Sequence, residues 1–197
     1  KIKSIDIKDT IPLSTGNLNS HIVIIETSYI EGKNEKYVIP ISIITGEIIA
    51  DVKFKHPEAM IAYVEVDGHE GVMYDGSYNK EVRDIFLQLI TQKGTVKNKK
   101  GSIVGVPGKK MSSKVTKSDL PLNSRVLLAE QSNTSILYDN KFFFKMYRSP
   151  EEGNNPELEI IKTLTENTSF RNFPTFAGAL EYRESNAESS ALGILID

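Results

Sequence analysis

The sequence contains no cysteine. This absence excludes disulfide bonds, thiolate zinc sites and cysteine nucleophiles, and it is typical of a cytoplasmic protein. No apolar run approaches the roughly 20 residues that a membrane span needs. The first residues alternate charged and apolar side chains, unlike a signal peptide. We therefore expect a cytoplasmic chain that neither spans a membrane nor is secreted.

The sequence also lacks an excess of charge of either sign. Lysine and arginine number 24 and acidic residues 26, which gives a net charge of -2. Such a balance provides no global field for polyanions, so nucleic acid and acidic membranes are not expected partners. The 197 residues are 39% hydrophobic, enough to bury a core in one large or two small domains. Because the sequence lacks an initial Met and ends on an apolar run, we expect a piece of a longer polypeptide.

The first half reads as strands followed by one helix. Residues 22–25 and 37–41 are β-rich runs that flank a polar turn, which predicts a hairpin. Further strands are predicted at residues 48–54, 59–66 and 72–74, with Asp67-Gly68 as a turn between the last two. A helix over residues 79–92 follows, capped by Asn79 and packed on this sheet. Its apolar stripe has helical spacing: Val82, Ile85, Phe86, Leu89 and Ile90.

A lysine-rich stretch separates the two halves. It holds Lys97, Lys99, Lys100, Lys109, Lys110, Lys114 and Lys117. These residues fit either a solvated hairpin and linker or an anion-binding patch. We predict a domain boundary here, between a domain of residues 1–113 and a second domain of residues 114–197.

The second half again combines strands with one helix. Strands are predicted at residues 125–130, 135–138, 142–147, 175–182 and 191–196. The helix begins at Pro156 after the N-cap Asn155, with Leu158, Ile161 and Leu164 as its inner stripe. The whole chain is thus expected to be α+β: an antiparallel sheet with a packed helix, then a second antiparallel sheet with one helix.

Most catalytic constellations are missing. The sequence has no strong phosphate-loop motif, and its three histidines lack the spacing of a metal site or a catalytic triad, so no catalytic residue or metal ligand is predicted.

One charged residue, Lys145, lies where a functional role is possible. Lys145 lies in a strand that is apolar on both faces, so it should be partly buried beside a carboxylate, with Glu159 the first candidate and Glu157 the second. Alternatively, it reaches past the sheet edge into solvent.

The hydroxyl-rich segment Ser132, Asn133, Thr134 and Ser135 could cradle a phosphate, or it could be an ordinary hairpin turn. A protein-kinase N-lobe has the same order of elements: a strand, a phosphate-covering turn, a second strand, a third strand that carries Lys, and a helix that carries Glu. Several runs together resemble the maltokinase family, often fused to trehalose synthase. They are Glu130-Gln131-Ser132-Asn133-Thr134-Ser135, Phe144-Lys145-Met146-Tyr147-Arg148, Asn155-Pro156-Glu157-Leu158-Glu159 and Gly178-Ala179-Leu180-Glu181-Tyr182-Arg183.

The resemblance extends to an N-terminal cap domain through Tyr37-Val38-Ile39-Pro40 and Gly71-Val72-Met73-Tyr74-Asp75. It implies an ATP-dependent kinase that makes maltose 1-phosphate, with this chain as its cap and kinase-like N-lobe. By the same resemblance, Ser132, Asn133, Thr134 and Ser135 cover the ATP phosphates, and Lys145 binds them. Glu159 pairs with Lys145, and Asp197 begins the hinge that contacts adenine.

One departure limits the activity to expect. Kinases of this kind use an Asp base, usually two residues after a His, and a second Asp on Mg²⁺. Here the positions two after each histidine hold Val23, Glu58 and Gly71. We therefore expect the base and the Mg²⁺ ligands in a C-lobe outside this chain, which should be inactive by itself. Two alternatives stay open: a kinase of the same fold with another acceptor, and a non-catalytic module that docks on trehalose synthase through an exposed apolar patch.

Overall fold

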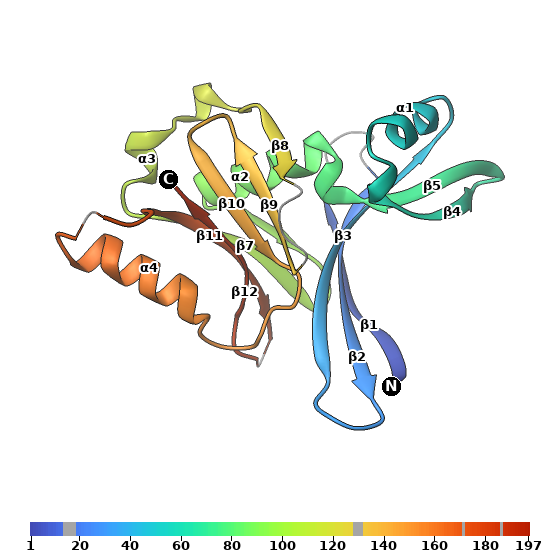
Figure 1. Cartoon of the computed structure of the whole chain (residues 1–197), viewed down its shortest axis with the longest axis horizontal. Helices are drawn as coiled ribbons and strands as arrows, with labels where there is room; N and C mark the ends of the chain where they lie inside the picture. The colour runs from blue at the N-terminus through green and yellow to red at the C-terminus, as the bar shows by residue number, and fades with distance from the viewer. Residues whose placement is uncertain (14–18, 128–131, 171, 186) are drawn as a thin grey trace.

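The computed structural model describes residues 1–13, 19–127, 132–170, 172–185 and 187–197. Within them the chain is α+β, with two antiparallel sheets and four α-helices (Figure 1). The helices are α1 (Ile48–Lys55), α2 (Lys80–Thr91), α3 (Met111–Lys114) and α4 (Pro156–Asn167), with single 3₁₀ turns at Pro57–Ala59, Gly76–Tyr78 and Lys117–Asp119. None of the described helices is long and apolar enough to cross a membrane.

The first sheet has the strand order β1-β2-β3-β5-β4. Its strands are β1 (Ile2–Leu13), β2 (Ser20–Tyr29), β3 (Glu35–Thr45), β4 (Met60–Val66) and β5 (His69–Asp75). The predicted hairpin is confirmed, since β2 and β3 pair antiparallel. The Asp67-Gly68 turn is confirmed as well, because both residues have positive φ, 51° and 78°, between the paired strands β4 and β5.

The strand predicted over residues 48–54 is wrong, because this segment is the helix α1. The prediction relied on its β-branched and aromatic residues. In the structure only Ile49 and Val52, three residues apart, pack against the small apolar cluster of Ala59, Val72 and Tyr74. Phe54 stays 88% exposed. Contacts at helical spacing therefore outweigh the intrinsic strand preference of the segment.

The second sheet has the order β6-β7-β11-β12-β10-β9-β8. Its strands are β6 (Thr95–Lys97), β7 (Gly101–Pro107), β8 (Ser124–Leu127), β9 (Asn133–Tyr138), β10 (Phe142–Tyr147), β11 (Phe176–Glu184) and β12 (Ser190–Ile196). The predicted boundary between residues 113 and 114 does not separate the two sheets. Both β6 and β7 precede it, yet β7 pairs with β11. This pairing joins segments about 75 residues apart, which local patterns cannot reveal.

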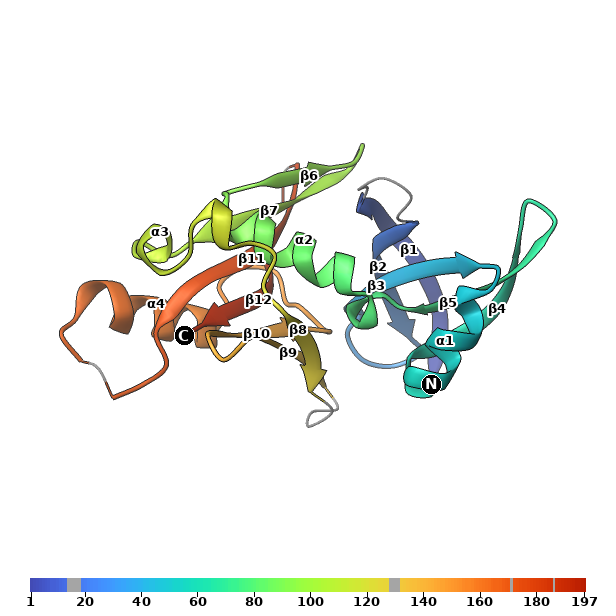
Figure 2. The ribbon, with the colours of Figure 1, turned by 90° about the horizontal axis from the view of Figure 1, so that it is seen from above.

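The helix α2 forms as predicted, and the side chain of Asn79 accepts a hydrogen bond from the backbone N–H of Glu81. Its packing is broader than predicted. It contacts β7 and β11 of the second sheet, and its apolar residues share one core with Leu13 and Ile22 of the first. Figure 2 shows α2 between the two sheets. The approach to β7 is so close that a Cβ on Gly105 would lie 1.8 Å from the carbonyl oxygen of Leu89.

Polar bonds also connect the two sheets. Arg148, just after β10, donates to the Asp75 carboxylate at 2.5 Å and to the Thr134 hydroxyl at 2.7 Å. Asp9 of β1 is buried and accepts a hydrogen bond from the Tyr182 phenol of β11 at 3.0 Å. Burial, and then Asp9, raise the pKa of Tyr182. Because these groups are largely out of water, the two sheets are held in a specific relative orientation.

Candidate functional site

The site is built around β10, which lies between β9 and β12 as a central strand of the second sheet. Its side chains alternate between the two faces. Phe144 and Met146 are buried in the core that includes α2. Tyr147 joins a second apolar cluster on the opposite face, which α4 covers. Lys145 belongs to this α4 face and is partly buried, with its side chain 23% exposed.

The helix α4 follows β10 in the sequence and begins as predicted. The side chain of Asn155 accepts a hydrogen bond from the backbone N–H of Leu158. Two residues of the predicted inner stripe, Leu158 and Ile161, pack against the cluster that contains Tyr147 and Ile194. This packing fixes the rotation of α4 about its axis and therefore decides which acidic side chain faces β10.

The carboxylate beside Lys145 is Glu157, the second of the two predicted candidates. The Lys145 ammonium donates to both carboxylate oxygens of Glu157, at 3.1 and 3.0 Å. The Tyr147 phenol donates to the same carboxylate at 3.0 Å. The prediction of Glu159 as the helix partner is wrong, because two residues correspond to about 200° of helical rotation and place Glu159 away from the sheet. It is exposed.

Glu157 is therefore shared by an ammonium and a phenol. Burial, and then the negative charge of Glu157, raise the pKa of Tyr147, which keeps the phenol protonated as a donor. With both donors bound, the carboxylate is held at one end of α4, and Lys145 is held over the sheet surface. The arrangement can present one oriented cation to an anionic ligand.

The four residues predicted as a phosphate-covering turn lie mostly in a strand. Asn133, Thr134 and Ser135 are the first residues of β9, and Ser132 is a bend just before it. The β8–β9 connection comprises residues 128–132, and Glu130 and Gln131 lie outside the described residues. Thr134 and Ser135 are buried, and the Thr134 hydroxyl accepts the bond from Arg148.

Ser135 is directly opposite Lys145 in the β9–β10 register. Paired residues of an antiparallel sheet share a face, so Ser135 lies on the face of Lys145. Its buried hydroxyl has no hydrogen-bond partner among the described residues. An unpaired buried hydroxyl costs free energy, so a polar group bound here would be stabilised by accepting its proton.

Asp197 lies apart from Lys145. In the sheet Lys145 pairs with Ile194, so Asp197 is three residues further along, about 10 Å at strand spacing. Its backbone N–H donates to the carbonyl of Thr175, and its carbonyl accepts from the N–H of Thr175. Its carboxylate contacts the ammonium of Lys114. The structure thus brings together Ser135, Lys145 and Glu157, and separates Asp197 from them.

The described residues contain no group of three or more side chains that could hold a metal ion. The arrangement of Lys145, Glu157 and Tyr147 can bind and orient an anion. The sequence matches no known protein-family model.

Proposed function

We propose that this chain is the cap and kinase-like N-lobe of an ATP-dependent sugar kinase of the maltokinase type, acting on maltose. The observation that carries the proposal is the bond between Lys145 on a central strand and Glu157 on the helix that directly follows this strand. Kinases use such a pair to position a lysine on the ATP phosphates. The order of strand, strand, Lys-bearing strand, Glu-bearing helix and two further strands also agrees with the resemblance.

In this proposal Lys145 contacts the phosphates, and Glu157 and Tyr147 orient it. The fit to ATP is supported by two features of the same face: the partial exposure of Lys145 and the unpaired hydroxyl of Ser135. ATP supplies the transferable phosphoryl group. The sequence has no His-x-Asp, the pattern that usually supplies the base in such kinases. We therefore assign the Mg²⁺ ligands and the base to a C-lobe outside this chain, and expect no turnover by the chain alone.

An NMR titration of the chain with ATP tests the nucleotide site directly. We expect the backbone shifts to change around Ser135 and Lys145. Lys145→Met should weaken ATP binding by about tenfold or more, because it removes a charge-assisted bond to phosphate. Glu159→Gln is the matched control and should bind ATP as the unmodified chain does. Equal ATP affinity in the Lys145→Met variant would refute the assignment.

A second experiment addresses catalysis. The isolated chain should show no maltose-dependent ADP production. In the full-length parent, Lys145→Met should lower kcat by a factor on the order of 10² to 10³, as for loss of one preorganised charge contact. Maltose-dependent turnover by the isolated chain would contradict the placement of the base. A kinase that phosphorylates another sugar in preference to maltose would correct the acceptor while leaving the nucleotide site in place.

A docking function is the second candidate, and one observation favours it. The first sheet and its helix α1 expose large apolar side chains, with Phe54 88% and Tyr63 73% exposed. The Lys53 ammonium lies 5.1 Å from the centroid of the Tyr63 ring, which places α1 beside β4. Exposed apolar groups of this size often mark a protein interface. Phe54→Ser should then weaken binding to purified trehalose synthase, whereas Ile160→Ser, which alters an exposed residue of α4, should not.

A further inference from the structure

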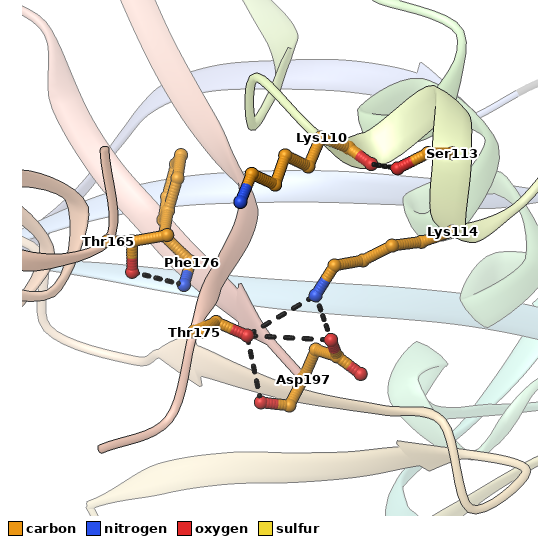
Figure 3. Close-up of polar contacts among 7 residues, drawn as sticks. All are labelled: Lys110, Ser113, Lys114, Thr165, Thr175, Phe176 and Asp197. Atoms are coloured by element: carbon orange, nitrogen blue, oxygen red, sulfur yellow. Dashed lines mark hydrogen bonds and ion pairs between the residues drawn. The ribbon is translucent and has the colours of Figure 1, made fainter. Parts of the chain in front are cut away.

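A second basic site lies at the other end of α4. A pocket of about 440 Å³ is bounded by α3 with the residues just before it, the C-terminal end of α4, and the adjacent ends of β11 and β12. It is lined by Lys109, Lys110, Lys114, Thr165, Thr175 and Asp197, among others. Figure 3 shows the side chains of Lys110 and Lys114 extending toward the side of the threonines and Asp197. The three lysines come from the stretch that the sequence left open between a solvated linker and an anion-binding patch.

The charges in this pocket are only partly paired. Lys109 lies 3.6 Å from the Glu166 carboxylate, and Lys114 contacts Asp197. Lys110 forms no ion pair with any carboxylate that the structure describes, and Figure 3 shows its ammonium reaching into the pocket. Three ammonium groups thus face two carboxylates. Burial, and then the positive charges of Lys110 and Lys141, lower the pKa of Lys114, although its ammonium also contacts the Asp197 carboxylate.

One hydroxyl group adds a neutral donor beside these cations. The Thr165 hydroxyl accepts a hydrogen bond from the Phe176 backbone N–H at 2.8 Å, which leaves its own proton available. The Thr175 hydroxyl accepts a hydrogen bond from the Lys114 ammonium at 3.3 Å and donates to Asp197, so its proton is already used. Ammonium and hydroxyl donors that converge on one cavity are the groups that bind phosphate oxygens.

We propose that this pocket binds the phosphate group of a small molecule, with Lys110 and Lys114 as its charged ligands and Thr165 as a hydroxyl donor. The site is distinct from the Lys145 site. Glu157 and Thr165 are eight residues apart on α4, about 12 Å along the helix axis. The proposal does not depend on ATP binding at Lys145, and it assigns Lys110 and Lys114 to a binding site and not to a solvated linker.

The test is an NMR titration of the chain with inorganic phosphate at constant ionic strength. Saturable shift changes are expected at residues 109–114, 165–168 and 175–176. Lys110→Gln should weaken phosphate binding about tenfold to a hundredfold, since it removes one charge-assisted contact. Lys99→Gln is the matched control, because Lys99 is an exposed lysine of the same basic stretch outside the pocket.

Two outcomes overturn the proposal: shifts that do not saturate, or equal weakening by Lys110→Gln and Lys99→Gln. A third distinguishes it from the proposed function. If Lys145→Met abolishes phosphate binding and Lys110→Gln leaves it unchanged, phosphate binds at Lys145 and the pocket is not a site. A parallel titration with glucose 6-phosphate identifies the source of the phosphate: similar affinity for both probes means that the pocket holds the phosphate group alone, and tighter binding of the sugar phosphate means that it also contacts the sugar.

Discussion

The pairing of Lys145 with Glu157 can be measured as a coupling free energy. The ammonium lies 3.0 Å from the nearer carboxylate oxygen, a separation at which two unit charges attract by about 1.4 kcal/mol in water. The side chains of Lys145 and Glu157 are 23% and 41% exposed, so solvent screening and the loss of side-chain freedom offset part of this attraction. We expect a coupling of about 0.5 to 1 kcal/mol, the upper range for partly exposed pairs.

The assay is a double-mutant cycle of urea unfolding with Lys145→Met, Glu157→Gln and the double variant. Glu157→Gln keeps an oxygen that can accept the Tyr147 hydrogen bond, so the cycle isolates the ion pair. A second cycle with Glu159→Gln is the control and should give a coupling near zero. Salt at about 0.5 M should reduce the first coupling, because it screens partly exposed charges. A larger coupling of Lys145 to Glu159 than to Glu157 would refute the arrangement described here.

Three further predictions concern the contacts between the two sheets and the packing of α2 on β7. Arg148→Leu removes a charged bond to Asp75 and should cost about 2 to 3 kcal/mol, seen in calorimetry as a fall in Tm of roughly 5 to 10 °C; an unchanged Tm would contradict a role in joining the sheets. Gly105→Ala forces α2 away from β7, because of the close Leu89 carbonyl, and should destabilise by about 3 kcal/mol or more in urea unfolding, so a neutral effect would contradict the close approach. Burial raises the pKa of Tyr182 above its ordinary value near 10, so above that pH the unfolded chain loses this proton more readily and stability should fall with rising pH. Urea unfolding between about pH 8 and 11 should show a shallower fall in Tyr182→Phe, and an identical slope would contradict the raised pKa.

The elements with strong local signals were predictable from the sequence. The stripe of α2, its cap Asn79 and the cap Asn155 of α4 all form as predicted, because capping and helical periodicity depend on residues within one or two turns. The central position of β10 was likewise predictable from two apolar faces. The segment 48–54 was wrongly predicted as a strand, because its composition favours a strand. In the structure it is helical, and Ile49 and Val52 make their contacts at helical spacing.

The partner of Lys145 was predictable in part. The sequence placed a carboxylate near this lysine, since a half-buried ammonium needs one. Choosing between the two glutamates required the angle around α4: at about 100° per residue, Glu157 is only about 40° from Ile161 on the inner stripe, whereas Glu159 is about 160° from it. The stripe itself therefore contained the signal that favours Glu157.

The sequence by itself determined the α+β class, the two long helices α2 and α4, most of the strands, and Lys145 as the residue that needs a negative partner, because each follows from local spacing and burial of charge. Only the tertiary structure decided the pairing of β7 with β11, the shared core on both sides of α2, and the gathering of Lys109, Lys110 and Lys114 with Thr165 and Thr175 in one pocket. These contacts join segments tens of residues apart. They depend on which apolar faces bury one another in three dimensions. The hydrophobic periodicity of a single segment does not show which other segment it will pack against.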